Sequence, residues 1–264
     1  MLINTIKNQN EYDRYLAYPN YTFEYINDIH NKGLIKSIHI PLIHSYLYLI
    51  GYMYKYGKYA DNCLNVKDIK EVLNFSRLNK EFDYIIKKNG VLDNLKLTES
   101  TTNFTIGYEI IDDNHSLIFI KDDELVRKTF YSNMNLTNRY VTKKPLYLFD
   151  NGDFAIENTT LLDFKVFQFC MKREDLGSIA FYIYSYLKHK NDKHVDGYDS
   201  GRFKLSKELN ISSSTISRYR DVLKDYNMIK SIKNNHNAHK IKVNTFDKFF
   251  NIKLKNKQVD ELLK

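Results

Sequence analysis

The chain has 264 residues, 43% of them hydrophobic and 27% charged, which is typical of folded globular proteins and allows one large domain or two small ones. No apolar run approaches the roughly 18 residues of a membrane span, and no secretory signal is visible, so a cytoplasmic protein without a membrane partner is expected. The net charge of +8 lies at one end: residues 165–264 hold 21 Lys and Arg against 11 Asp and Glu, whereas residues 1–164 hold 19 against 21. This asymmetry points to a polyanionic partner.

Residues 1–20 are polar without a clear period and are expected to form an N-terminal arm. A helical stripe with a proline in its first turn predicts a helix from Pro41 to Lys55, and a short helix is predicted from Val66 to Leu73. A third helix is predicted to end at Asn89-Gly90. Its inward face is expected to consist of Leu78, Phe82, Ile85 and Ile86.

After Gly90 the apolar period changes from that of a helix to that of a strand. The segments "LDNLKLTES", "NFTIGYEII" and "HSLIFIK" predict strands, with a turn at Asp112-Asp113-Asn114 between the last two. Asp150-Asn151-Gly152 predicts a hairpin turn. The segment from Leu161 to Phe169 is so apolar that one strand or buried segment is expected there.

A second round of elements follows. It comprises a Tyr-rich helix that contains Leu176 to Leu187, a short helix from Leu205 to Leu209, a helix from about Ser213 to Tyr226, and a hairpin in "SIKNNHNAHKIKV". Because the first round has the same order, we expect an α+β fold with two similar domains in tandem, at 21–158 and 159–264.

The helix that follows "NISSS" has two contrasting faces. One helical face is expected to pack inward, with Ile216, Tyr219, Leu223 and Tyr226 at its spacing. The opposite face begins with hydroxyl side chains and continues with Arg218. One serine suffices to cap a helix, so three serines and a threonine at this end exceed what capping requires.

The stretch "LSKELNISSSTISRYRDVLKDYNMI" and the hairpin after it resemble the winged helix-turn-helix segment of bacterial DNA-binding proteins. In that family the third helix enters the major groove with its N-terminus first. The resemblance implies that double-stranded DNA is the partner. The implied DNA-binding residues are Ser212, Ser213, Ser214, Thr215, Ser217, Arg218 and Arg220 on the helix, and Lys233, His236, His239 and Lys240 on the hairpin, or wing.

The first round, "VKDIKEVLNFSRLNKEFDYIIKKNGVL", has the same layout as the second but no basic excess. The face that corresponds to the DNA-reading face carries Ser76, Arg77, Asn79, Lys80, Glu81 and Asp83. Three roles stay open for it: dimerisation, contact with flanking DNA backbone, or packing alone.

Two tandem winged-helix domains in a chain of this length resemble the replication initiators of plasmids and related mobile elements. In that architecture the C-terminal domain reads origin sites and the N-terminal domain mediates dimerisation, so a homodimer is expected. The alternative is a transcriptional regulator of the winged helix-turn-helix type, whose N-terminal domain dimerises or senses a ligand.

An enzyme is not expected, and neither a metal nor another cofactor is implied. His39 and His44 lack the spacing of a metal-dependent nickase, because two histidines five residues apart on a strand point to opposite faces. His236 and His239 have no carboxylate or cysteine partner nearby in the sequence. Cys63 and Cys170 fit no metal-ligand spacing and are expected to be reduced. No GxxxxGK[ST] phosphate loop occurs.

Overall fold

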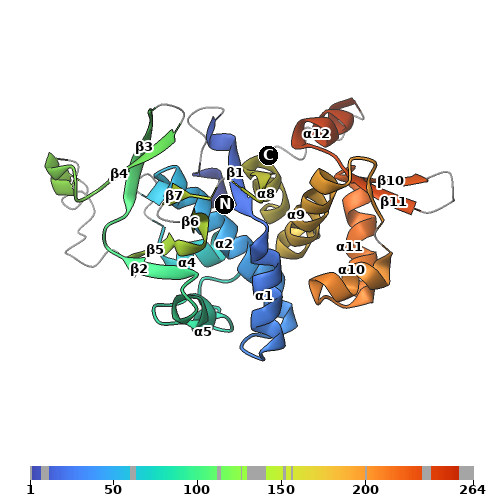
Figure 1. Ribbon diagram of the computed structural model, residues 1–264, viewed down its shortest axis with the longest axis horizontal. Coiled ribbons are helices and arrows are strands. Elements are labelled where there is room, and N and C mark those ends of the chain that lie inside the picture. Colours follow the sequence, from blue (N-terminus) through green and yellow to red (C-terminus); the bar gives the residue numbers. More distant parts are fainter. Residues whose placement is uncertain are drawn as a thin grey trace. The chain divides into compact units, whose positions relative to one another are not determined.

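The computed structural model (Figure 1) describes residues 2–6, 12–59, 64–111, 114–125, 127–129, 141–150, 153–155, 157–199, 201–233 and 239–255. The fold is mixed α and β, with helices beside small antiparallel sheets. This confirms the predicted α+β class. None of the described helices is both long and apolar enough to cross a membrane.

The chain forms two compact units, which divide it differently from the predicted segments. Unit 1 comprises Met1–Pro19 and Ser45–Asn158, and unit 2 comprises Asn20–His44 and Thr159–Lys264. Two contacts explain why Asn20–His44 belongs to unit 2. The Thr160 hydroxyl donates to Asn20 Oδ1 at 2.7 Å, and the Phe23 ring stacks 5.7 Å from that of His189.

Unit 1 is built from short helices and three small β-ladders. Its elements are β1 (Tyr15–Pro19), most of α2 (Ile40–Lys55), α4 (Val66–Val72), α5 (Asp83–Ile86), α6 (Val91–Asn94), β2 (Thr98–Thr101), β3 (Thr105–Ile111), β4 (Asn114–Phe119), β5 (Thr142–Pro145), β6 (Phe149–Asp150) and β7 (Asp153–Phe154). Strand β2 pairs with β5, β3 with β4 and β6 with β7, all antiparallel. The predicted helix from Pro41 to Lys55 and the predicted hairpin around Asn151-Gly152 are thereby confirmed; residues 112–113 and 151–152 of the predicted turns lie outside the described part.

The N-terminal residues do not form a separate arm. Ile3, Ile6, Leu16 and Tyr18 are all at most 1% exposed. They are buried in unit 1 because side chains of this size gain about 1.5–3 kcal/mol each when fully removed from water. The first twenty residues are polar on average, so the sequence pattern did not reveal that these four apolar side chains pack into the core.

The predicted third helix of unit 1 is wrong over most of its length. The chain forms turns between Leu73 and Phe82, α5 covers only four residues, and Leu78 is 75% exposed instead of buried. Lys70 explains the break, because its ammonium group donates both to the Asn79 carbonyl and to the Asp83 carboxylate. Lys70 thus supplies a hydrogen-bond donor to a backbone carbonyl of the turn, which would have an intrahelical partner in a continuous helix.

Unit 2 has a helical core and a three-stranded sheet at one side (Figure 1). Its elements are α1 (Tyr21–Asn31), β8 (Thr159–Asp163), α8 (Phe164–Met171), α9 (Gly177–Lys193), β9 (Tyr198–Asp199), α10 (Arg202–Leu209), α11 (Ser213–Asp225), β10 (Ile229–Lys233), β11 (His239–Val243) and α12 (Phe246–Lys255). The sheet is antiparallel in the order β10-β11-β9. The predicted single segment from Leu161 to Phe169 is instead the strand β8 followed by α8, because the Asp163 carboxylate caps α8 by accepting from the Lys165 amide at 2.9 Å.

Helix α9 is the centre of unit 2. Its residues from Ala180 to Leu187 are all buried, which exceeds one face of a helix. The Phe181 ring lies 5.1 Å from that of Phe167 on α8, and the Tyr184 hydroxyl donates to the Asn244 carbonyl at 2.9 Å. Helix α11 packs beside α9, α10 packs on α11, and the hairpin β10–β11 follows α11 (Figure 1).

Candidate nucleic-acid interface

The turn between α10 and α11 fixes the direction in which α11 starts. Asn210 adopts a left-handed conformation (φ 51°, ψ 37°), which ends α10 as the sequence predicts. Ile211 is 9% exposed and therefore holds the turn to the core. The Ser206 hydroxyl donates to the Ile211 carbonyl at 2.6 Å, which closes the turn.

The first turn of α11 carries a cluster of hydroxyl groups. Ser212 is the N-cap and its Oγ accepts from the Thr215 amide at 3.2 Å. The same Oγ lies 3.1 Å from Ser214 Oγ and 2.7 Å from Thr215 Oγ1. Ser212 and Ser214 are exposed, whereas Ser213, Thr215 and Ser217 are half-buried. One serine therefore serves as the cap, and the others leave short donors and acceptors at the exposed end of the helix.

The inward face of α11 is the predicted one up to Leu223, and Tyr226 is half-buried. Ile216 and Leu223 are fully buried and Tyr219 is 5% exposed. Arg218 is exposed beside this face, with its guanidinium carbon 4.8 Å from the centroid of the Tyr219 ring. Arg218 Nη2 donates to the Tyr219 hydroxyl at 3.1 Å. The tyrosine thus orients a guanidinium group whose other N–H groups can reach a ligand.

Arg220 does not belong to the exposed face. It follows Ile216 by four residues, so it lies on the same side of the helix as that buried side chain. It is half-buried, and burial lowers its pKa from 12.5, an effect that Asp221 opposes. The structure therefore separates Arg220 from Ser214 and Arg218, with which the sequence grouped it.

Acidic side chains occupy the exposed face of α11 after its first two turns. Asp221 and Asp225 are exposed and follow Ser214 by seven and eleven residues, which is the spacing of one helical stripe. Two carboxylates would repel phosphate groups. The part of α11 from Ser213 to Arg218 carries no carboxylate.

The hairpin holds the remaining predicted residues. Its backbone register pairs Lys233 with His239, and Lys240 with Ile232 of β10 and Asp199 of β9. Lys240 is half-exposed. His236 lies outside the described residues. For Lys233 and His239 the backbone register places both at the end of the strands next to 234–238.

Unit 2 carries cations that no described carboxylate neutralises. Unit 2 has 23 Lys and Arg against 14 Asp and Glu. Within the described part of unit 2, cations without an ion-pair partner include Arg202, Lys204 and Lys207 on α10, Arg218 on α11, and Lys230, Lys240 and Lys242 on the hairpin. Others lie on other elements, such as Lys36, Lys165, Lys190 and Lys248. The cations of α10 and Lys242 of the hairpin are not among the DNA-binding residues predicted from the sequence. The available signal was the lysine at alternate positions in "HKIKV", which places Lys240 and Lys242 on one face of a strand.

Unit 1 uses its cations differently. Arg77 forms ion pairs with Asp68 at 2.6 Å and with Glu71 at 3.0 Å, and Lys87 pairs with Asp83 at 2.7 Å. Arg77 is thus directed to acidic neighbours of its own unit. The face that the sequence aligned with the DNA-reading face carries Arg77 and Lys80 against Glu81 and Asp83, so it has no net positive charge to attract a polyanionic ligand.

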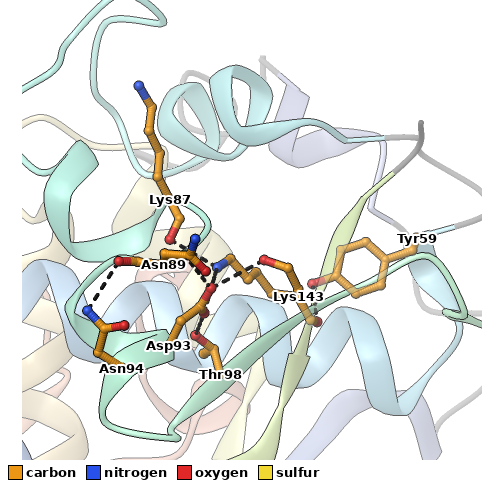
Figure 2. A network of polar contacts seen from close by, with 8 residues as sticks. Tyr59, Lys87, Asn89, Asp93, Asn94, Thr98 and Lys143 are labelled. Carbon is orange, nitrogen blue, oxygen red and sulfur yellow. Dashed lines mark hydrogen bonds and ion pairs between the residues drawn. The ribbon is translucent and has the colours of Figure 1, made fainter.

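Unit 1 also contains a partly buried network of polar contacts around Lys143 and Asp93 (Figure 2). Lys143 of β5 donates to both carboxylate oxygens of Asp93 of α6 at 2.6 Å, and to the Lys87 carbonyl at 3.1 Å. Asp93 also accepts from the Thr98 hydroxyl at 2.6 Å and from the Asn89 amide at 3.0 Å. The network joins α6 to the β2–β5 ladder and fills the hydrogen-bonding positions of the carboxylate, so its role in this structure is to hold unit 1 together.

The electrostatics of the network agree with that role. Burial works against the charged form of Asp93, but the hydrogen bonds from Lys143 and Thr98 outweigh it, so the pKa of Asp93 lies below 3.8. Burial also lowers the pKa of Lys143 from 10.5, and Asp93 opposes this shift. The hydrogen bonds from Lys143 and Thr98 therefore favour the charged form of Asp93.

Comparison with known proteins adds no relative to this description. No protein-family model, no curated protein and no solved structure matches the chain. The case for a function rests on the residues of the chain and their arrangement.

Proposed function

We propose that this protein binds double-stranded DNA in a sequence-specific manner, and that unit 2 reads the DNA with the first two turns of α11. The observation that carries the proposal is the exposed N-terminal turn of α11, where the hydroxyl groups of Ser212 and Ser214 lie beside an oriented Arg218. Short hydroxyl side chains permit close approach, the free N–H groups of a helix N-terminus attract phosphate, and arginine recognises guanine.

The distribution of charge supports the proposal. Several of the cations without a described acidic partner lie on α10 and α11 and on the hairpin that follows α11. Lysine and arginine side chains that neutralise phosphates release the counterions bound to the nucleic acid, so a basic surface binds nucleic acid more tightly at low salt.

The order of elements supports a winged helix-turn-helix identity for unit 2. Two helices joined at the left-handed Asn210 are followed by the antiparallel hairpin β10–β11, as in the family that the sequence resembles. Unit 1 repeats the order with α4, the short helices α5 and α6, and the ladder β2–β5. We propose a tandem winged-helix protein in which only unit 2 retains an uncompensated basic face.

Within this class, we favour a replication initiator of a plasmid or related mobile element, acting in the cytoplasm as a homodimer. The support is the resemblance of a tandem winged-helix pair to such initiators. A transcriptional regulator would use the same DNA-binding face and is the second candidate.

The test begins with selection of preferred sequences from a pool of random 40-base-pair duplexes. Recovery of one sequence motif that the protein protects from nuclease digestion supports the proposal, and failure to enrich any motif contradicts it. The initiator is then separated from the regulator by genetics. An initiator maintains a plasmid whose only origin contains repeats of the motif, whereas a regulator changes the output of a promoter and maintains no plasmid.

A further inference from the structure

Glu208, in the last turn of α10, accepts two hydrogen bonds from elements outside the helix pair α10–α11. The Tyr198 hydroxyl of β9 donates to Glu208 Oε1 at 2.6 Å. Asn27 Nδ2 of α1 donates to the backbone carbonyl of Glu208 at 2.7 Å. These three residues, the Glu208 network, therefore connect β9, α10 and α1 within unit 2.

The hydrogen bond from Asn27 caps the end of α10. The last four carbonyl groups of a helix have no intrahelical partner, and Glu208 is followed by only one further residue of α10. Its carbonyl is satisfied by a side chain that lies 181 positions away in the chain. Because the left-handed Asn210 and the start of α11 come directly after this point, the network holds the end of α10 from which α11 takes its direction.

Neither packing nor charge explains the carboxylate of Glu208. The residue is half-buried, and none of the described cations forms an ion pair with it. Burial of a charge without a cation costs free energy. A negative charge also opposes the binding of a polyanion by the basic unit 2. What the carboxylate does supply is a strong acceptor for the hydroxyl group of Tyr198.

Tyr198 is itself held in place. It is 6% exposed, and its ring stacks on that of His194 with 5.5 Å between the centroids. Burial, together with the hydrogen bond to Glu208 and the charge of that carboxylate, raises the pKa of Tyr198. The hydroxyl therefore stays protonated and remains a donor, so β9 and α10 are joined by a charge-assisted hydrogen bond.

We propose that Asn27, Tyr198 and Glu208 are positioning residues for DNA recognition, which fix the end of α10 and thereby the angle at which the first turn of α11 meets the bases. This inference rests on the proposed function. Helix α1 lies outside the part of the chain that resembles a winged helix-turn-helix, so it would contribute to sequence recognition without touching DNA. The network orients α11 and supplies no cation, so it serves base contacts and not the phosphate contacts that all sequences share.

The experiment compares two duplexes of 40 base pairs, one with the selected motif and one of the same composition without it. Tyr198→Phe and Asn27→Ala each remove one hydrogen bond of the network. The matched control is Tyr184→Phe, which removes another buried hydroxyl of unit 2, one that donates to the Asn244 carbonyl at 2.9 Å outside the network. Fluorescence anisotropy gives the two affinities, and thermal unfolding gives the Tm.

We expect Tyr198→Phe and Asn27→Ala each to weaken binding to the motif by about tenfold, the effect of losing one hydrogen bond. Binding to the other duplex and its salt dependence should stay unchanged, because no charge is removed. Tyr184→Phe should lower the Tm by a similar amount and leave the ratio of the two affinities unchanged. An equal ratio for Tyr198→Phe and Tyr184→Phe would overturn the inference, as would an equal loss on both duplexes. Failure of the unmodified protein to prefer the motif would instead refute the proposed function.

Two substitutions of Glu208 separate its hydrogen bond from its charge, and they decide the question even if Tyr198→Phe does not fold. Glu208→Gln keeps an oxygen acceptor for the Tyr198 hydroxyl, so we expect a ratio of affinities within about twofold of that of the unmodified protein. Glu208→Met is of similar size and has no oxygen acceptor, so we expect the ratio to fall about tenfold. Equal losses with both variants, or normal recognition of the motif by Glu208→Met, would overturn the inference.

Discussion

The guanidinium group of Arg218 lies over the ring of Tyr219, its neighbour in the chain, and donates a hydrogen bond to the hydroxyl group of that tyrosine. The tyrosine is buried and the arginine is exposed. A long, flexible cation at the surface is thereby held in one orientation before it meets a ligand, which reduces the entropy lost on binding.

Substitution of Arg218 tests this assignment. Arg218→Ala is expected to weaken binding to the selected motif by about 1–3 kcal/mol and to relax the preference at one base pair, because a bidentate contact to guanine is lost. The control is Arg220→Ala on the same helix, which is expected to lower stability and leave the sequence preference intact. Repeating the selection with both variants measures the outcome, and a stronger loss of preference with Arg220→Ala would show that the wrong face was assigned.

Ser212 allows the capping role to be separated from DNA contact. Ser212→Ala removes the acceptor for the Thr215 amide and is expected to lower the free energy of unfolding by about 1 kcal/mol. Ser212→Asp retains a cap and suits the helix dipole, so stability is expected to be unchanged. Its negative charge should repel phosphate and weaken DNA binding at least tenfold. Urea denaturation and anisotropy measure the two effects, and normal DNA binding by Ser212→Asp would place this end of α11 away from the DNA.

The pair of Lys143 and Asp93 is predicted to matter for folding and not for binding. Lys143→Met leaves the half-buried Asp93 carboxylate without its cation and is expected to lower the free energy of unfolding by about 3 kcal/mol. The double variant Lys143→Met/Asp93→Leu removes both charges and should recover most of that loss. Urea denaturation of the two variants provides the measurement. If the single variant were as stable as the unmodified protein, the network would not hold unit 1 together.

Acid should destabilise unit 2 through two buried histidines. Burial lowers the pKa of His44 to about 3, and burial, with Lys190 and Lys193, lowers the pKa of His189 to about 4. The unfolded chain binds these protons near pH 6.5, so stability is present above that pH and falls as the pH decreases toward the folded-state values. Each histidine is expected to contribute a loss of about 1–2 kcal/mol between pH 7 and 5.

Thermal unfolding at pH 7 and pH 5 measures this effect. In the variant His44→Phe/His189→Phe, which keeps the aromatic stacking around Phe23, we expect a smaller change in Tm between the two pH values. An unchanged pH dependence would assign the acid sensitivity to other groups.

Local sequence determined the elements of unit 2 from Leu205 to Val243. The left-handed stops at Asn210 and Asn227, the inward stripe of α11, and the hairpin after it all depend on residues within a few positions of one another. Capping, helical period and turn conformation are short-range effects, so a single sequence is enough to predict them.

The tertiary structure decided what local patterns could not. In unit 1, the helical period around Phe82 predicted a long helix, but Lys70 draws Asn79 and Asp83 into a turn. In unit 2, Arg218 and Arg220 look equivalent in the sequence, and only packing shows that one is exposed and the other half-buried.

The same holds for charge. The sequence showed an excess of lysine and arginine after residue 164, whereas strand register showed that Lys230 faces Lys242 while Lys144 faces Glu99. Whether a cation is neutralised depends on which residue the fold brings opposite to it. That residue can stand far away in the chain, so composition and period determined the kind of partner to expect, and only the tertiary structure decided which side chains are left to meet it.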